Sequence, residues 1–312
     1  MFNSLDLFLG CVFDHEWCSR APLADEYHPG TRKEFLDTIM EHIRSDNDQN
    51  ILWLYGLPRT GKTVISWAVH DFCREERRIG ATLFFRHIGG CDPSKVVCRL
   101  AGWLHDLSRD VALMIAETVA TNPGIINAPL REQFEKLIYD PLTKAELDVR
   151  APLAVILDGL DECGTRETRK EMLELIREDF PRLSKQLRFF ITSRPEEDIA
   201  EALSVPSIPA LYLDNETPAS RYDLSRYLSK NFIEITKVEH NIDPVPPGWT
   251  LWHNENLELV EKVARGRFEW VAELILAYRG TGSPEWFLRV LERAAKDKVA
   301  RMETEGRALV KT

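Results

Sequence analysis

Short apolar runs recur along the first two thirds of the chain, and they lack the polar alternation of half-exposed strands. Five of them predict strands, at residues 51–55, 81–85, 153–157, 187–192 and 210–213. Continuous runs of Leu, Ile, Val and Phe are typical of strands that are buried on both faces of a parallel sheet. The pattern therefore predicts an open parallel sheet of five strands.

Segments with helical periodicity separate these runs. They predict helices at 63–74, 94–107, 131–139, 168–180 and 196–203. Strands that alternate with helices indicate an α/β fold in which the sheet is doubly wound.

The pattern changes after residue 214. Segments 220–235, 254–265, 268–278 and 284–296 all predict helices, and no strand is expected among them. We therefore divide the chain into an N-terminal extension (1–21), an α/β domain (22–215), an all-helical domain (216–296) and a charged tail (297–312).

The segment G-L-P-R-T-G-K-T at 56–63 follows the first predicted strand and opens a predicted helix. It matches the phosphate-loop pattern G-x-x-x-x-G-K-[ST], in which backbone N–H groups and a helix N-terminus converge on phosphates. Lys62 supplies a positive charge to the β/γ oxygens, and Thr63 supplies a hydroxyl for Mg²⁺. A chance match in a chain of this size has odds of roughly 1%. The segment therefore predicts a nucleoside triphosphate site of the P-loop NTPase type.

A second motif, A-V-I-L-D-G-L-D-E-C at 154–163, ends a buried strand in a cluster of acids. Asp158 would reach the carboxyl edge of the sheet, where it can hold Mg²⁺. Asp161 or Glu162 would follow one turn later, placed to orient an attacking water as general base. A solvated turn is the alternative interpretation.

The third motif is F-F-I-T-S-R-P at 189–195, where another buried strand ends in hydroxyls and a guanidinium. Ligands of open α/β sheets bind at this edge. Arg194 is therefore a candidate sensor of the γ-phosphate. A surface ion pair is the alternative role for Arg194.

The composition is that of a globular protein: of 312 residues 44% are hydrophobic and 29% charged, with a net charge of −10. An acidic chain binds nucleic acid only through a local basic patch, for which the sequence gives no direct indication. No stretch approaches the roughly 18 apolar residues of a membrane span. The six cysteines form no C-x-x-C pair, which favours a reduced, cytoplasmic compartment.

The three motifs together resemble those of NACHT-type signalling ATPases of the STAND class. They are most similar to the fungal branch, whose N-terminal NTPase is labelled nephrocystin-like. Three further segments agree: H-P-G-T-R at 28–32, L-F-F-R at 83–86, and 259–272 with its G-R-F-E-W. The resemblance covers about residues 22–280. It implies a P-loop NTPase domain followed by a helical lid. A strand candidate at 81–85, between the loop strand and the Asp158 strand, predicts in addition that the sensor strand inserts between those two in the sheet.

The resemblance also implies the site residues. Those expected to hold the nucleotide are Arg32, Gly56, Arg59, Thr60, Gly61, Lys62, Thr63 and Val64, with Arg32 near the base or ribose. Thr63 and Asp158 are the expected metal ligands, and Asp161, Glu162 and Arg194 the expected catalytic group. Relatives carry Gly or Ala where Arg59 stands, so Arg59 bears on the hydrolysis rate more than on binding.

The function that the resemblance implies is a signalling switch like those of innate immunity. ATP or GTP would bind with Mg²⁺ and be hydrolysed slowly, and the nucleotide state would control self-association or contacts with other NLR-like proteins. We expect a minimal member without evident effector or sensor-repeat domains.

Two alternatives stay open at this point. One is a dedicated enzyme, either an AAA+-like mechanical ATPase or a small-molecule kinase, although the sequence shows neither an acceptor pocket nor an Arg-rich lid. The other is a non-hydrolysing scaffold that binds nucleotide only to fold. Asp158, Asp161 and Glu162 argue against the scaffold, and Arg59 keeps it open.

Overall fold

The computed structural model describes residues 30–85, 92–145, 151–215, 217–235 and 268–281, with the single positions 237, 264, 289, 290 and 293. They form two compact units, a larger one within 34–58 and 62–213 and a smaller one within 22–33, 59–61 and 214–312. The expected N-terminal extension and charged tail lie outside the described residues, as do most of the helices expected at 254–265 and 284–296. The two units are described separately.

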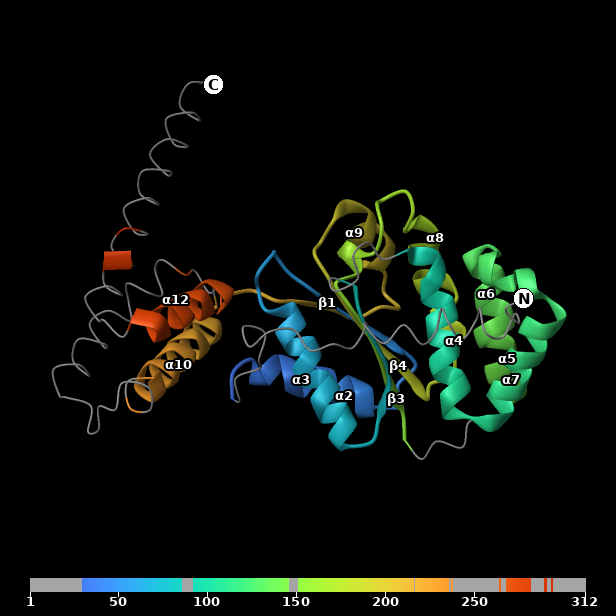
Figure 1. The fold of residues 1–312 in the computed structure, drawn as a ribbon, viewed down its shortest axis with the longest axis horizontal. Helices are drawn as coiled ribbons and strands as arrows, with labels where there is room; N and C mark the ends of the chain where they lie inside the picture. Colours follow the sequence, from blue (N-terminus) through green and yellow to red (C-terminus); the bar gives the residue numbers. More distant parts are fainter. Residues whose placement is uncertain are drawn as a thin grey trace, which may run out of the picture. The chain divides into compact units, whose positions relative to one another are not determined.

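The larger unit is built on a parallel sheet of five strands (Figure 1). Its strands are β1 (Ile51–Tyr55), β2 (Ile79–Phe84), β3 (Leu153–Asp158), β4 (Leu187–Ser193) and β5 (Ala210–Tyr212). They lie in the order β2-β3-β4-β1-β5, and every pairing is parallel. The predicted sheet is therefore confirmed, and so is the insertion of the sensor strand β4 between the loop strand β1 and the acid strand β3.

Both faces of the sheet are covered by helices, which explains why the strands are apolar without alternation. On one face Leu153, Val155 and Leu157 of β3 belong to a core shared with the helices that follow β2, β3 and β4. On the other face Phe84 of β2 stacks on Trp67 of α3, with ring centroids 4.1 Å apart. Successive strand residues point to opposite faces, so both sets must be apolar to be buried.

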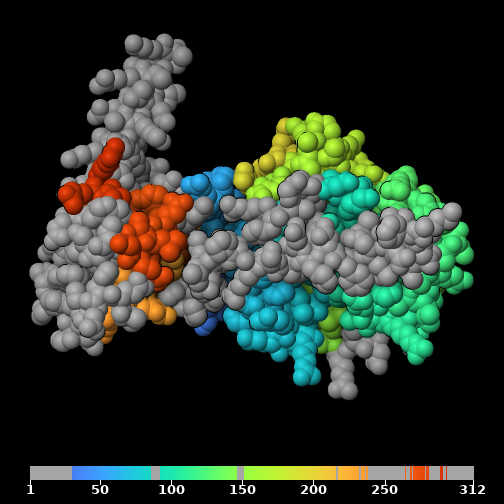
Figure 2. All heavy atoms as spheres, viewed as in Figure 1, coloured from blue at the N-terminus to red at the C-terminus, as the bar shows by residue number. Residues whose placement is uncertain are grey.

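The helices of the α3 face are α2 (Lys33–Arg44) and α3 (Lys62–Glu75). Those of the opposite face are α4 (Val96–Leu107), α5 (Arg109–Thr121), α6 (Leu130–Phe134), α7 (Asp140–Lys144), α8 (Lys170–Glu178) and α9 (Glu197–Leu203). Short 3₁₀ turns lie at Pro93–Lys95, Pro123–Asn127, Leu160–Glu162 and Phe180–Arg182. In Figure 2 the atoms of this part of the larger unit, from α4 to α7, are those coloured teal to green.

Three details differ from the sequence expectation. Strand β2 begins at Ile79, two residues early, and has an irregular register at Gly80, where a Cβ atom would lie 2.7 Å from the Trp103 ring. The helix expected at 131–139 is α6 followed by a π-helical turn, Glu135–Tyr139. Helices α5 and α7 have no counterpart among the predicted helices.

The smaller unit contains α10 (Pro218–Glu234) and α12 (Phe268–Thr281). Leu224 and Leu228 of α10 pack with Val271 and Ile275 of α12 in a core of their own. Among the helices that the structure describes in either unit, none is both long and apolar enough to cross a bilayer.

Candidate functional site

The phosphate-loop segment connects β1 to α3, and its lysine is the first residue of α3. The ammonium of Lys62 donates hydrogen bonds to the carbonyl oxygens of Gly56 (2.8 Å) and Leu57 (2.9 Å). Burial lowers the pKa of Lys62, while the carboxylates of Asp161 and Asp158 oppose that effect. A partly desolvated ammonium at a helix N-terminus gains strongly from an anionic ligand.

Backbone conformation sets the course of this loop. Gly61 has φ +93° and Arg59 has φ +64°, both in the left-handed region. Glycine adopts that region freely, whereas a residue with a Cβ atom pays for it. Val64 is the third residue of α3, and the N–H of Gly56 donates to the carbonyl oxygen of Ser193 at the end of β4 (3.3 Å).

The carboxylate of Asp158, the last residue of β3, is buried between α3 and β4. It accepts hydrogen bonds from the hydroxyls of Thr63 (2.9 Å), Ser66 (2.6 Å) and Thr192 (2.6 Å). Burial raises the pKa of Asp158, although all three hydrogen bonds and Lys62 favour its charged form. The motifs predict that Thr63 lies near Asp158, whereas the contacts of Ser66 and Thr192 are additional to that prediction. Their positions, one turn after Thr63 and two residues before Arg194, were the available signal.

The donor set at Asp158 and Thr63 fits Mg²⁺. One carboxylate and one hydroxyl are hard oxygen ligands, and Mg²⁺ takes few protein ligands because it keeps waters and phosphate oxygens in its shell. Residues 30–85, 92–145 and 151–215, like the other described positions, contain no cluster of three or more His, Cys, Asp or Glu suited to a metal ion. A dedicated all-protein metal centre is therefore not found in this part of the chain.

The acidic loop after β3 turns on Gly159, whose φ is +77°, and continues as the 3₁₀ turn Leu160–Glu162. The carboxylate of Asp161 accepts a hydrogen bond from the backbone N–H of Arg194 (2.8 Å). It also forms an ion pair with the side-chain Nε of Arg194 (3.1 Å). Nη2 of Arg194 lies 3.7 Å from the carboxylate of Glu162. The Asp161 side chain is only 4% exposed, against 32% for Glu162. Of the two acids, Glu162 is thus the more accessible to a water molecule.

Arg32 lies in the smaller unit, where its guanidinium is directed at protein atoms. It donates to Ser220 and Asn215 and, more weakly, to the carbonyl oxygen of Thr60 (3.4 Å), and it lies over the ring of Phe268. Burial lowers the pKa of Arg32 to about 10. That Arg32 approaches the base or ribose remains a prediction.

The structure thus brings together Lys62, Thr63, Asp158, Asp161, Glu162 and Arg194 at the carboxyl edge of one parallel sheet. A loop with a lysine and a hydroxyl, facing a strand that ends in an acid, is the arrangement of a nucleotide-binding P-loop domain.

Among solved structures, C. elegans PCH-2 is similar, with 14% identity, a TM-score of 0.40, and coverage of 88% of this chain and 70% of that chain. No curated protein matches the sequence. The family described as Nephrocystin 3, N-terminal, matches residues 30–194, which is more than half of the chain. The chain therefore belongs to the nephrocystin 3 N-terminal family.

Proposed function

We propose that this protein is a nucleotide-dependent switch of the NACHT/STAND type, which binds ATP or GTP with Mg²⁺ and hydrolyses it slowly. The observation that carries the proposal is the hydrogen bond between Thr63 and the buried carboxylate of Asp158, beside the ammonium of Lys62. A metal-binding hydroxyl, a metal-binding acid and a phosphate-binding cation are thereby grouped at one sheet edge.

In the proposed complex the α3 N-terminus and Lys62 bind the β- and γ-phosphates. Thr63 and Asp158 hold Mg²⁺, which neutralises phosphate charge when it is bound. The backbone N–H groups of Lys62 to Val64 would face the same phosphates, because the first N–H groups of a helix have no partner within the helix.

For hydrolysis we assign different roles to the two acids. Asp161 is buried against Arg194 and fixes the position of that arginine. Glu162, being more exposed, orients and deprotonates the attacking water.

Arg194 gives the site its switch character. Its guanidinium pairs with Asp161 and Glu162, and a γ-phosphate would compete with these acids for the same charge. A triphosphate and a diphosphate would therefore favour different positions of Arg194, and a difference in affinity of this kind shifts a conformational equilibrium. We further propose that α10 and α12 belong to a helical lid, and that the switch acts in the cytoplasm by self-association or by contacts with NLR-like signalling proteins.

The binding part is tested by equilibrium titration with fluorescent ATP and GTP analogues in the presence of Mg²⁺. Lys62→Ala is expected to weaken binding at least 50-fold, an order-of-magnitude figure for a charge-assisted phosphate contact. Lys185→Ala is the matched control, because Lys185 is an exposed lysine paired with Asp48. Equal affinity of Lys62→Ala and wild type would refute the proposal.

Turnover and assembly separate the alternatives. We expect slow hydrolysis, and light scattering that differs between ATP-bound and ADP-bound protein. Turnover above tens per second would favour a mechanical ATPase instead. Nucleotide binding without any turnover would favour a scaffold.

A further inference from the structure

Arg169 occupies the junction between the acidic loop and the segment that follows β4. It precedes α8, and its side chain is only 3% exposed. Nη1 donates to the main-chain carbonyl oxygen of Asp161 (2.8 Å). Nε and Nη2 donate to the two carboxylate oxygens of Asp198 (2.7 and 3.0 Å), and Nη2 also donates to Glu196.

This guanidinium is a buried charge with matched partners. A bidentate pair between arginine and carboxylate is among the strongest side-chain contacts. Its planar geometry fixes the orientation of the two groups as well as the distance between them. Burial alone would lower the pKa of Arg169, but the hydrogen bonds that Arg169 donates to the carboxylates of Asp198 and Glu196 raise it. The side chain is therefore charged and rigidly held, which is the property required of a group that sets the position of others.

Arg169 and Arg194 hold Asp161 from two sides. Arg169 donates to the main-chain carbonyl oxygen of Asp161. The carboxylate of Asp161 contacts Arg194 at two atoms, the backbone N–H and the side-chain Nε. Glu196 lies two residues after Arg194 in the chain, and its carboxylate accepts a hydrogen bond from Arg169. These contacts close a ring that joins the acidic loop to the start of α9, and Glu162 is adjacent to Asp161 within it.

We propose that Arg169 is a positioning residue for hydrolysis: it fixes the acidic loop against the Arg194 segment, so that Glu162 and Arg194 face the same phosphoryl group. The inference rests on the proposed function. Arg169 touches neither nucleotide nor water in this role. Its removal should therefore lower the rate of hydrolysis without weakening the contacts that Lys62 and Thr63 make.

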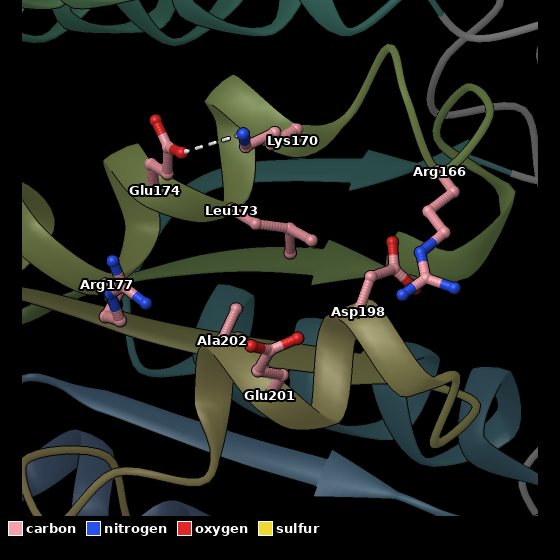
Figure 3. A pocket seen from close by; sticks show the side chains of 8 residues that line it. All are labelled: Arg166, Lys170, Leu173, Glu174, Arg177, Asp198, Glu201 and Ala202. Atoms are coloured by element: carbon pink, nitrogen blue, oxygen red, sulfur yellow. Dashed lines mark ion pairs between the residues drawn. The ribbon is translucent and has the colours of Figure 1, made fainter.

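A nearby arginine provides the matched control. Asp198 lines a surface groove of about 300 Å³ between α8 and α9, together with Arg166 and Lys170 (Figure 3). Arg166 pairs with Glu197 (2.9 Å) and is 56% exposed. Arg166→Gln thus removes one guanidinium from the same groove, at a residue outside the ring around Asp161.

The test compares steady-state turnover with the affinity for a fluorescent ATP analogue. Arg169→Gln is expected to lower kcat at least tenfold while changing the dissociation constant less than threefold. Arg169→Lys should recover part of kcat because it keeps the charge, and Arg166→Gln should match wild type. If Arg169→Gln does not fold, the variant Asp198→Asn is used instead. It keeps Arg169 but weakens the contact between Arg169 and residue 198. A smaller loss of kcat at unchanged affinity is then expected.

A double-mutant cycle separates positioning from general destabilisation. In a Glu162→Gln background, Arg169→Gln should reduce the residual turnover by clearly less than the tenfold expected in the wild-type background, because one of the two groups that it positions is already inactive. If the losses of kcat from Arg169→Gln and Glu162→Gln simply multiply, or if folded Arg169 variants keep wild-type kcat, the role of Arg169 is refuted. The proposed hydrolysis is not refuted by either result. A wild-type chain that binds nucleotide without hydrolysing it overturns this role together with the proposed hydrolysis, whereas a wild-type chain that binds no nucleotide refutes the proposed function as a whole.

Discussion

The hydroxyl of Thr63 lies 2.9 Å from a carboxylate oxygen of Asp158, although 95 positions separate the two residues in the chain. Their contact follows from the fold, because parallel strands deliver their carboxyl ends to one edge of the sheet, where α3 begins. Ser66 and Thr192 complete a set of three hydroxyls around the acid. The carboxylate is thus well bonded but buried, so its charge is a cost to the protein without metal.

Asp158→Asn should therefore raise stability while abolishing the response to Mg²⁺. Burial raises the pKa of Asp158, and a carboxyl group whose pKa is raised by folding destabilises the native state at pH values above that pKa. Asn has nearly the same shape and keeps hydrogen-bonding capacity toward the hydroxyls. We expect a higher midpoint of thermal unfolding without nucleotide, and nucleotide binding that no longer strengthens when Mg²⁺ is added.

The control for Asp158→Asn is Asp48→Asn, which removes one acid at an exposed ion pair with Lys185. Exposed pairs contribute little, typically about 0–1 kcal/mol, so this variant should neither gain stability nor lose the Mg²⁺ response. A lower melting temperature for Asp158→Asn would contradict the inference that the buried charge of Asp158 destabilises the protein.

The two acids after Gly159 should differ in their kinetic effects. Glu162→Gln is expected to lower kcat by about 10²-fold or more, the usual range for loss of a general base, with little change in nucleotide affinity. Asp161→Asn should instead alter the preference for ATP over ADP, because Arg194 loses its buried anionic partner. Single-turnover hydrolysis and competition binding measure the two effects. Identical behaviour of the two variants would remove the distinction between their roles.

Much of the sheet could be predicted because its strands are apolar on both faces. β1 and β4 were expected within one residue of their ends, and β3 likewise, since continuous runs such as 153–157 leave little choice. The position of β4 between β1 and β3 followed from a strand candidate at 81–85. Strand β2 begins two residues before the predicted run at 81–85, and its Gly80 admits the Trp103 ring, a contact that the pattern of apolar residues does not reveal.

The contacts that complete the site could not be predicted from one sequence. Ser66 and Asp158 are 92 positions apart, and Arg169 and Asp198 are 29 apart. A serine inside a helix or an arginine before one is unremarkable by composition, and its role depends on which elements the fold places next to it. Motif spacing pointed to Lys62, Asp158 and Arg194. The residues that support them do so through tertiary contacts, which a single sequence does not reveal.

Stability should fall in mild acid because of His42 on α2. Burial, and next the positive charge of Arg188, lower the pKa of His42 to about 4. Between the unfolded value of about 6.5 and this folded value, only the unfolded chain binds the proton, so the free energy of unfolding decreases as the pH falls. Between pH 7 and pH 4.5 the expected loss from this group is on the order of 2 kcal/mol.

Urea denaturation of wild type and His42→Gln at both pH values isolates this contribution. Acids elsewhere titrate in both proteins, so the difference between the two pH slopes belongs to His42. The variant should lose less stability than wild type on acidification. Parallel slopes would show that His42 is protonated in the folded protein.

Arg59 should tolerate glycine better than a β-branched residue. Its φ of +64° lies in the left-handed region, which costs a residue with a Cβ atom roughly 1–2 kcal/mol and a β-branched one more. Glycine removes that cost but gains a comparable freedom in the unfolded chain. Arg59→Gly should therefore stay within about 0.5 kcal/mol of wild type, whereas Arg59→Val should lose about 1–2 kcal/mol and bind nucleotide more weakly, because the loop leaves its phosphate-binding course. Urea denaturation and nucleotide titration of both variants test this, and equal effects of Gly and Val would show that backbone conformation at Arg59 does not limit the loop.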